Sequence, residues 1–314
     1  MATFEKMRLA TEALRHVVPD FHKWFEGALP DGKEGLRLLE GGNYAEAEKC
    51  FQRVVAALKD RSLPRGRHAR VLLALATTQW KQKRLGEARE TAESARDLLT
   101  GPKTKRGAEL AECLDLLGRI YSDDGDLPAA SAAFQEALDI EKETRQSDSK
   151  ILTERYRHLA GALWAAGHLA EAKDAFEQAV KTSEKAHGEM HTLTADCLID
   201  LGQCLSAHDE HDAARETLEK GLEIHRQLCG ADSEEVARDY QALASAAHMA
   251  KDLEASVAYY EKALHLRERQ LGGNAAEFAM LLVSLAGVHS TEGRPARALE
   301  LLQQAVPRLE GARD

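Results

Sequence analysis

The chain has 314 residues, of which 44% are hydrophobic, 30% are charged and only 5% are aromatic, and its formal net charge is −10. This acidic balance argues against a broad surface for nucleic-acid phosphates. The sequence contains no apolar stretch long enough to cross a bilayer or to act as a signal peptide, and its five cysteines lack paired spacing. We therefore expect a cytoplasmic protein with reduced thiols, no nucleic-acid partner and no membrane association.

The amino-terminal segment, residues 1–27, differs from everything that follows it. It carries an apolar set on expected helices that are broken near Pro19: Phe4, Met7, Leu14, Val17, Val18, Phe21, Trp24 and Phe25. Two interpretations stay open. The segment caps the exposed edge of the structure that follows, as solenoid proteins need for solubility, or it docks in a groove or on a second chain.

From residue 28 to residue 307 one pattern occurs seven times. A small residue recurs at a spacing of 41 once and 42 five times, at Ala47, Ala88, Ala130, Ala172, Ala214, Ser256 and Ala298. Another small residue lies twelve positions before each of these, and a larger apolar residue lies four positions after all but one. Self-similarity at such a period is typical of a solenoid, in which identical supersecondary units stack on one another.

Each unit is predicted to form two helices. In the fourth unit, apolar residues from Tyr156 to Leu163 have helical spacing, and Leu169 begins a second helical run after a short polar break. Glycine occupies this break in four units, at Gly42, Gly125, Gly167 and Gly293. A glycine just past a helix end adopts the left-handed conformation without a Cβ penalty. The small residues let two helices approach closely, and the larger residue that follows fills the remaining space.

The third unit matches five positions of a known repeat pattern, W-x₂-L-G-x₂-Y followed by A-x₃-F, at Leu117, Gly118, Tyr121, Ala130 and Phe134, and has Leu114 at the position of the Trp. The chain therefore resembles tetratricopeptide repeat proteins, although the leading Trp and the closing Pro are missing. The last four units are also similar to the 42-residue repeats of kinesin light chains. These resemblances imply an all-α, right-handed α-solenoid of about seven helix-turn-helix repeats over residues 28–307, followed by a short tail, residues 308–314.

The resemblance also implies where a partner binds, because the first helices of tetratricopeptide units line a concave groove. The inward positions are Arg70, Leu73, Thr77, Trp80, Glu112, Asp115, Arg119, Ser122, Glu154, Arg157, Trp164, Asp196, Ile199, Gln203, Arg238 and Gln241. Trp80 and Trp164 occupy the same position two units apart and are interleaved with Arg119 and Arg157. Aromatic residues beside arginine are typical of recognition surfaces. A tryptophan can equally stabilise the stack of repeats, so both interpretations stay open.

The sequence contains no nucleotide-binding, protease or paired-cysteine motif. The nearest metal-ligand candidates are two histidine pairs, His187 with His191 and His208 with His211. A helix of about 16 residues separates these pairs by roughly 24 Å, so they cannot share an ion. We expect neither an enzyme nor a cofactor nor a metal site.

These observations predict a non-catalytic scaffold that binds a peptide or a helical segment of a partner protein in its groove. The alternative is a regulatory module in which ligand or peptide binding changes the shape of the superhelix and modulates a bound effector. At the carboxy-terminal end, no later unit covers the apolar residues Leu299, Leu302 and Val306. We expect this edge to be the place where a homo-oligomer would form.

Overall fold

The computed structural model describes residues 30–59, 65–100, 107–144, 149–271 and 276–310. Within these ranges the chain forms fourteen helices and no strand. The amino-terminal segment 1–27, for which a cap or a docking role is expected, lies outside the described residues. None of the helices in the described ranges is both long and apolar enough to cross a membrane.

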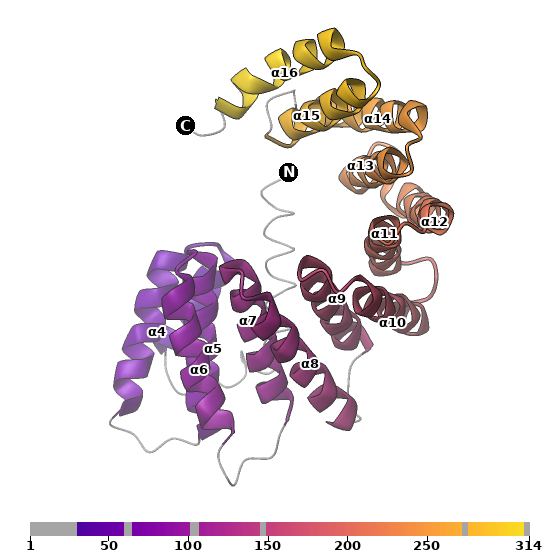
Figure 1. Ribbon diagram of the computed structural model, residues 1–314. Helices are drawn as coiled ribbons and strands as arrows, with labels where there is room; N and C mark the ends of the chain where they lie inside the picture. Colours follow the sequence, from indigo (N-terminus) through magenta and orange to yellow (C-terminus); the bar gives the residue numbers. More distant parts are fainter. Residues whose placement is uncertain (1–29, 60–64, 101–106, 145–148, 272–275, 311–314) are drawn as a thin grey trace. The chain divides into compact units, whose positions relative to one another are not determined.

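The helices form successive hairpins in two compact units, residues 1–166 and 167–314 (Figure 1). The first unit contains α3 (Pro30–Glu40), α4 (Tyr44–Lys59), α5 (Arg65–Lys81), α6 (Leu85–Leu99), α7 (Ala108–Asp124), α8 (Leu127–Thr144) and α9 (Ser149–Ala165). The second contains α10 (Leu169–His187), α11 (Thr192–Ala207), α12 (His211–Cys229), α13 (Glu234–Met249), α14 (Leu253–Leu271), α15 (Ala276–Thr291) and α16 (Pro295–Glu310). The expected all-α architecture of paired helices is confirmed.

The repeating small residues are the points where the helices of a pair come closest. All seven, from Ala47 to Ala298, are buried. A Cβ atom added to Gly118 of α7 would lie 2.6 Å from the ring of Phe134 on α8, and one added to Gly202 would lie 2.6 Å from Cγ of Leu218. Such distances are far below van der Waals contact, so these positions exclude any side chain. The large residue four positions after the small one fills the groove, as the sequence predicts.

Every turn between paired helices contains one residue in the left-handed conformation. The four predicted glycines have φ angles between 75° and 85°. The equivalent turns of the other three repeats use Lys83, Asp209 and Lys251, with φ angles of 61°, 61° and 63°. Side chains with a Cβ rarely adopt this conformation, because the Cβ approaches the following carbonyl oxygen. These three turns are therefore strained.

Relief of this strain should be measurable at Lys251, which is exposed. We expect Lys251→Gly to raise the free energy of unfolding by about 0.5–1 kcal/mol, since the gain from removing the Cβ exceeds the entropy that glycine adds to the unfolded chain. Urea denaturation followed by circular dichroism measures this change. Lys251→Ala is the matched control, because it removes the same charge and keeps the strain. An equal gain from both variants would contradict the explanation.

Buried polar pairs distinguish one junction between repeats from the next. Between α8 and α9, Arg155 Nη2 lies 3.3 Å from Glu141 Oε2 in the interior. The equivalent positions between α12 and α13, 84 residues later, hold His225 and Asp239, whose Nδ1 and Oδ2 atoms are 2.7 Å apart. A buried charge without its partner is strongly destabilising. Removal of either partner alone should therefore destabilise its junction.

The pair of His225 and Asp239 makes the stability of the second unit depend on pH. Burial lowers the pKa of His225, but the hydrogen bond to Asp239 and the charges of Asp239, Asp196 and Glu235 outweigh it, so the pKa of His225 is raised overall. Burial also raises the pKa of Asp239. Both shifts mean that the folded state binds protons more tightly than the unfolded state.

We therefore expect the free energy of unfolding to be highest below the ordinary histidine pKa, near pH 6.5, and to fall as the pH rises through the higher pKa of folded His225. Urea denaturation at pH 6, 7 and 8 measures this slope. His225→Gln should make it shallower but not abolish it, because Glu112, whose pKa burial raises to about 8, also loses its proton in this range. His265→Gln, which changes an exposed histidine of α14, should leave the slope unchanged. The same slope in wild type and His225→Gln would contradict this assignment.

Candidate functional site

A polar cluster runs along α5, α7 and α9 of the first unit. Glu112, Asp115 and Arg119 are three and four residues apart, so they share one face of α7. Trp80 approaches this face from α5, and two further polar side chains approach it from α9. We call the set the α7 cluster: Trp80, Glu112, Asp115, Arg119, Arg155 and His158.

Asp115 is the anionic centre of the α7 cluster. The residue is only 8% exposed, and its carboxylate contacts Arg119 Nη2 at 2.9 Å and His158 Nδ1 at 2.9 Å. Burial alone would raise the pKa of Asp115, but the charges of Arg119, His158 and Arg155 and the hydrogen bond from His158 hold it well below its ordinary value. Asp115 therefore stays ionised and joins α7 to α9.

Glu112 behaves in the opposite way. Burial raises its pKa to about 8, and the nearby charges of Arg155 and Arg70 offset this only in part. At neutral pH its carboxyl group is therefore largely protonated and can donate a hydrogen bond. Arg155 is itself buried and donates from Nη1 to the carbonyl oxygen of Ala111 at 2.7 Å. Glu112 therefore adds little negative charge to the α7 cluster at neutral pH, although the sequence shows an acidic residue there.

Trp80 is a half-buried aromatic side chain flanked by cations. Its indole N–H donates to Asp123 Oδ2 at 3.0 Å, and part of the ring packs on the core of the first unit. The guanidinium carbon of Arg119 lies 5.9 Å from the ring centroid, and Lys81 Nζ lies 4.3 Å from it. Trp80 therefore contributes to the stack of helices and also leaves part of its ring exposed beside two cations.

Four of the sixteen residues predicted for the groove are corrected by the structure. Leu73, Thr77, Asp115 and Ile199 are at most 8% exposed. The reason is that the first helix of a repeat packs against the helices before and after it. Its solvent-exposed face is therefore too narrow to include all four positions that were predicted on it. Ile199, for example, would lie 2.8 Å from a Cβ at Gly221 of α12. These four side chains cannot offer a free surface.

The other twelve predicted residues retain solvent contact. Arg238 and Gln241 of α13 are exposed. The remaining ten are half-buried: Arg70, Trp80, Glu112, Arg119, Ser122, Glu154, Arg157, Trp164, Asp196 and Gln203. The structure brings Trp80 and Arg119 together in the first unit, whereas Asp196 faces the buried His225 in the second, at 3.7 Å from its Nε2. Their role in binding stays a prediction.

Sequence reasoning missed Arg155 and His158 of the α7 cluster. A signal for Arg155 was available, because four other units carry an uncharged residue at its position, Val71, Cys113, Cys197 and Leu281, and only Asp239 is also charged. A charge at a core position of two units indicates a specific partner in each of them. The part of the chain that the structure describes contains no group of three His, Cys, Asp or Glu side chains placed to hold a metal ion.

A second candidate surface lies on α16. Leu299, Leu302 and Val306 are 57%, 38% and 50% exposed. The residues equivalent to Leu302 in the other six repeats are all buried: Phe51, Ala92, Phe134, Phe176, Leu218 and Tyr260. Within the part of the chain that the structure describes, Leu302 is therefore exposed at a position where each earlier repeat has a buried residue.

Comparison with known proteins places the chain among helical repeats. Family models described as tetratricopeptide repeat match residues 33–101, 110–148, 153–227, 209–269 and 239–311. A search of curated protein sequences found no match.

Solved structures with the same fold cover most of the chain. The apo form of RapI is 12% identical, with a TM-score of 0.70 over 90% of this chain and 97% of that chain. Kinesin light chain repeats from Podosopora anserina are 18% identical, with a TM-score of 0.61 over 67% and 99%. The Rap conjugation gene regulator of plasmid pLS20, in complex with the Phr* peptide, is 16% identical, with a TM-score of 0.56 over 90% and 73%. At these identities the likeness shows the fold alone.

Proposed function

Because the chain belongs to the tetratricopeptide repeat family, we propose that it is a non-catalytic scaffold that binds a peptide or helical segment of a partner protein. The binding surface is the exposed side of the first helices of its repeats. Trp80 carries this proposal, because its partly exposed indole lies beside Arg119 and Lys81. Rigid aromatic side chains next to arginine are the usual anchors of protein interfaces.

The electrostatics of this surface favour a partner segment of mixed charge. Burial and the neighbouring charges of Arg119 and Lys83 lower the pKa of Lys81. An acidic side chain of a partner would relieve this repulsion, while an apolar neighbour packs on the exposed part of Trp80. The acidic residues that line the same helices, Glu154 on α9 among them, would accept a basic residue farther along the segment.

A peptide-responsive regulatory module is the second candidate. It is favoured by the fold shared with the pLS20 regulator, whose structure contains the Phr* peptide, over 90% of this chain. In this alternative, peptide binding along the first helices alters the arrangement of the repeats and modulates a bound effector. We also propose a cytoplasmic location, because the five cysteines, all within the described ranges, form no disulfide and four of them are buried.

The anchor role of Trp80 is tested by Trp80→Ala. We expect affinity for the partner to fall about 30-fold or more, while the free energy of unfolding falls by about 1–3 kcal/mol, because the ring is only half buried. Affinity capture from the native host, quantified by mass spectrometry, measures the first effect, and urea denaturation the second.

The matched control is Leu114→Ala, which truncates a buried residue of the same core without changing the surface. It should cost about 2–5 kcal/mol of stability and leave capture unchanged. If the two variants lose the partner equally, Trp80 is a structural residue only and the binding surface lies elsewhere.

We also propose that the apolar face of α16 mediates self-association of the chain. Leu302→Glu should then lower the mass measured by sedimentation equilibrium, because a carboxylate at a covered apolar contact is unfavourable. Glu300→Gln, at an exposed site of the same helix, is the control and should leave the mass unchanged. A wild-type protein that remains monomeric at high concentration would exclude this contact.

A further inference from the structure

The second unit contains a cavity of about 520 Å³ between α12, α13 and α14. Ala246 and Ala247 of α13 and Ala250, directly after its end, form its floor together with Leu243, and Tyr259 of α14 forms one wall. Its volume is within the range of small-molecule sites. Ala247 lies nine residues from Arg238, which is half a turn around α13. The cavity is therefore separate from the partner surface proposed above.

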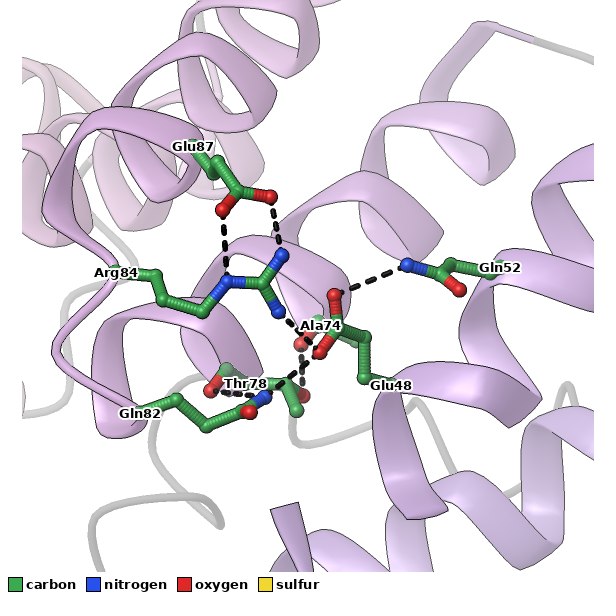
Figure 2. A network of polar contacts seen from close by, with 7 residues as sticks. All are labelled: Glu48, Gln52, Ala74, Thr78, Gln82, Arg84 and Glu87. Carbon is green, nitrogen blue, oxygen red and sulfur yellow. Dashed lines mark hydrogen bonds and ion pairs between the residues drawn. The ribbon is translucent and has the colours of Figure 1, made fainter. Parts of the chain in front are cut away.

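The equivalent place in the first unit is filled by a network of side chains (Figure 2). Thr78, Gln79 and Gln82 stand where the cavity has its three alanines. Gln82 Nε2 donates to Glu48 Oε2 at 2.9 Å, and Arg84 Nη1 lies 2.6 Å from the same oxygen. Glu48 is only 6% exposed, so its carboxylate and the side chains bonded to it are packed in the interior at this place.

The ion pair of Glu48 and Arg84 at the centre of that network has an equivalent in a later repeat, where the acidic and the basic residue have exchanged positions. Lys173 and Glu210, at the equivalent positions of a later junction, are 2.6 Å apart. In the junction that holds the cavity these positions are Arg215 and Asp252, and they do not contact each other. Arg215 Nη2 instead lies 3.3 Å from Asp212 Oδ1 on its own helix, with both side chains largely exposed. Asp252 Oδ1 accepts a hydrogen bond from the backbone N–H of Ala255.

The cavity thus separates a cation and an anion that pair in other junctions. His211 adds a third polar group to its lining, at a position where other repeats have Leu85, Leu127, Leu169 and Leu253. Its Nδ1 atom is buried and has no hydrogen-bond partner. A purely apolar ligand would make no use of the separated charges of Arg215 and Asp252, and a simple anion would meet Asp252 and Glu219 as well as Arg215.

We propose that this cavity binds a small zwitterion with an apolar body, either a free amino acid with a large side chain or a dipeptide. The ligand carboxylate pairs with Arg215 in the planar geometry that a guanidinium favours, and the ammonium pairs with Asp252. The apolar body lies on the alanine floor against Tyr259. Exposed ion pairs within one helix are weak, so Arg215 can exchange Asp212 for the ligand.

The test is isothermal titration of the full chain with L-phenylalanine and with the dipeptide Ala-Phe. We expect saturable binding with a Kd of about 1 mM or lower, as for ligands of this size. The ligand that binds more tightly shows whether the site takes a free amino acid or a dipeptide. N-acetyl-L-phenylalanine and L-phenylalaninamide each lack one charge, and both should bind at least about tenfold more weakly than the zwitterion. Equal binding by the amide or the acetyl compound would overturn the proposed charge pairing.

Ala247→Leu tests the location of the site. Leu163 and Leu205 occupy the equivalent position in other repeats, so the variant should fold, and it should abolish binding. Arg215→Gln should weaken binding about tenfold or more, whereas Arg226→Gln, at an exposed position near the other end of α12, should not. No binding of either ligand up to about ten times the expected Kd, or unchanged binding by Ala247→Leu, would overturn the proposal. So would a change in sedimentation mass on Ala247→Leu, which would show that a second copy occupies the cavity.

Discussion

The close contact of two helices at one small residue is the constraint on which the structure depends. At Gly118 and Gly202 there is no room for a Cβ beside Phe134 and Leu218, so the two helices of a repeat meet at a set distance. The same contact recurs with a period of 41 or 42 residues. Because no single hairpin can bury its apolar face, each repeat relies on the next, and stability is a sum of neighbouring contacts.

A repeated geometry makes equivalent positions comparable, and differences between them become informative. The same pair of positions holds Glu141 with Arg155 in one junction and His225 with Asp239 in another. Both pairs are buried, so the two junctions are held together by different polar contacts. Around Glu48 these positions hold polar side chains that form a network. Around Arg215 the equivalent positions hold alanines, and a cavity lies there while the helices still stack.

The α7 cluster shows how burial selects the groups that remain available to a partner. Asp115 is compensated by Arg119 and His158, and Glu112 is largely protonated because burial raises its pKa to about 8. Their carboxyl groups therefore contribute little free negative charge. Trp80 and the cations beside it stay at the surface, which is why the proposed partner segment combines an apolar residue with an acidic one.

The sequence by itself determined the helical hairpins, their period, the buried small residues and the four turn glycines, because these depend on local conformation and on spacing along the chain. Only the tertiary structure decided which face of each first helix is free. Exposure there depends on side chains about 42 residues away, as Asp115 and its partner His158 illustrate. For the same reason the burial of Leu73 and Ile199, the ion-pair partner of Arg155 and the alanine-floored cavity could not be read from periodicity. A period reports where repeats are alike, whereas these sites arise where neighbouring repeats differ.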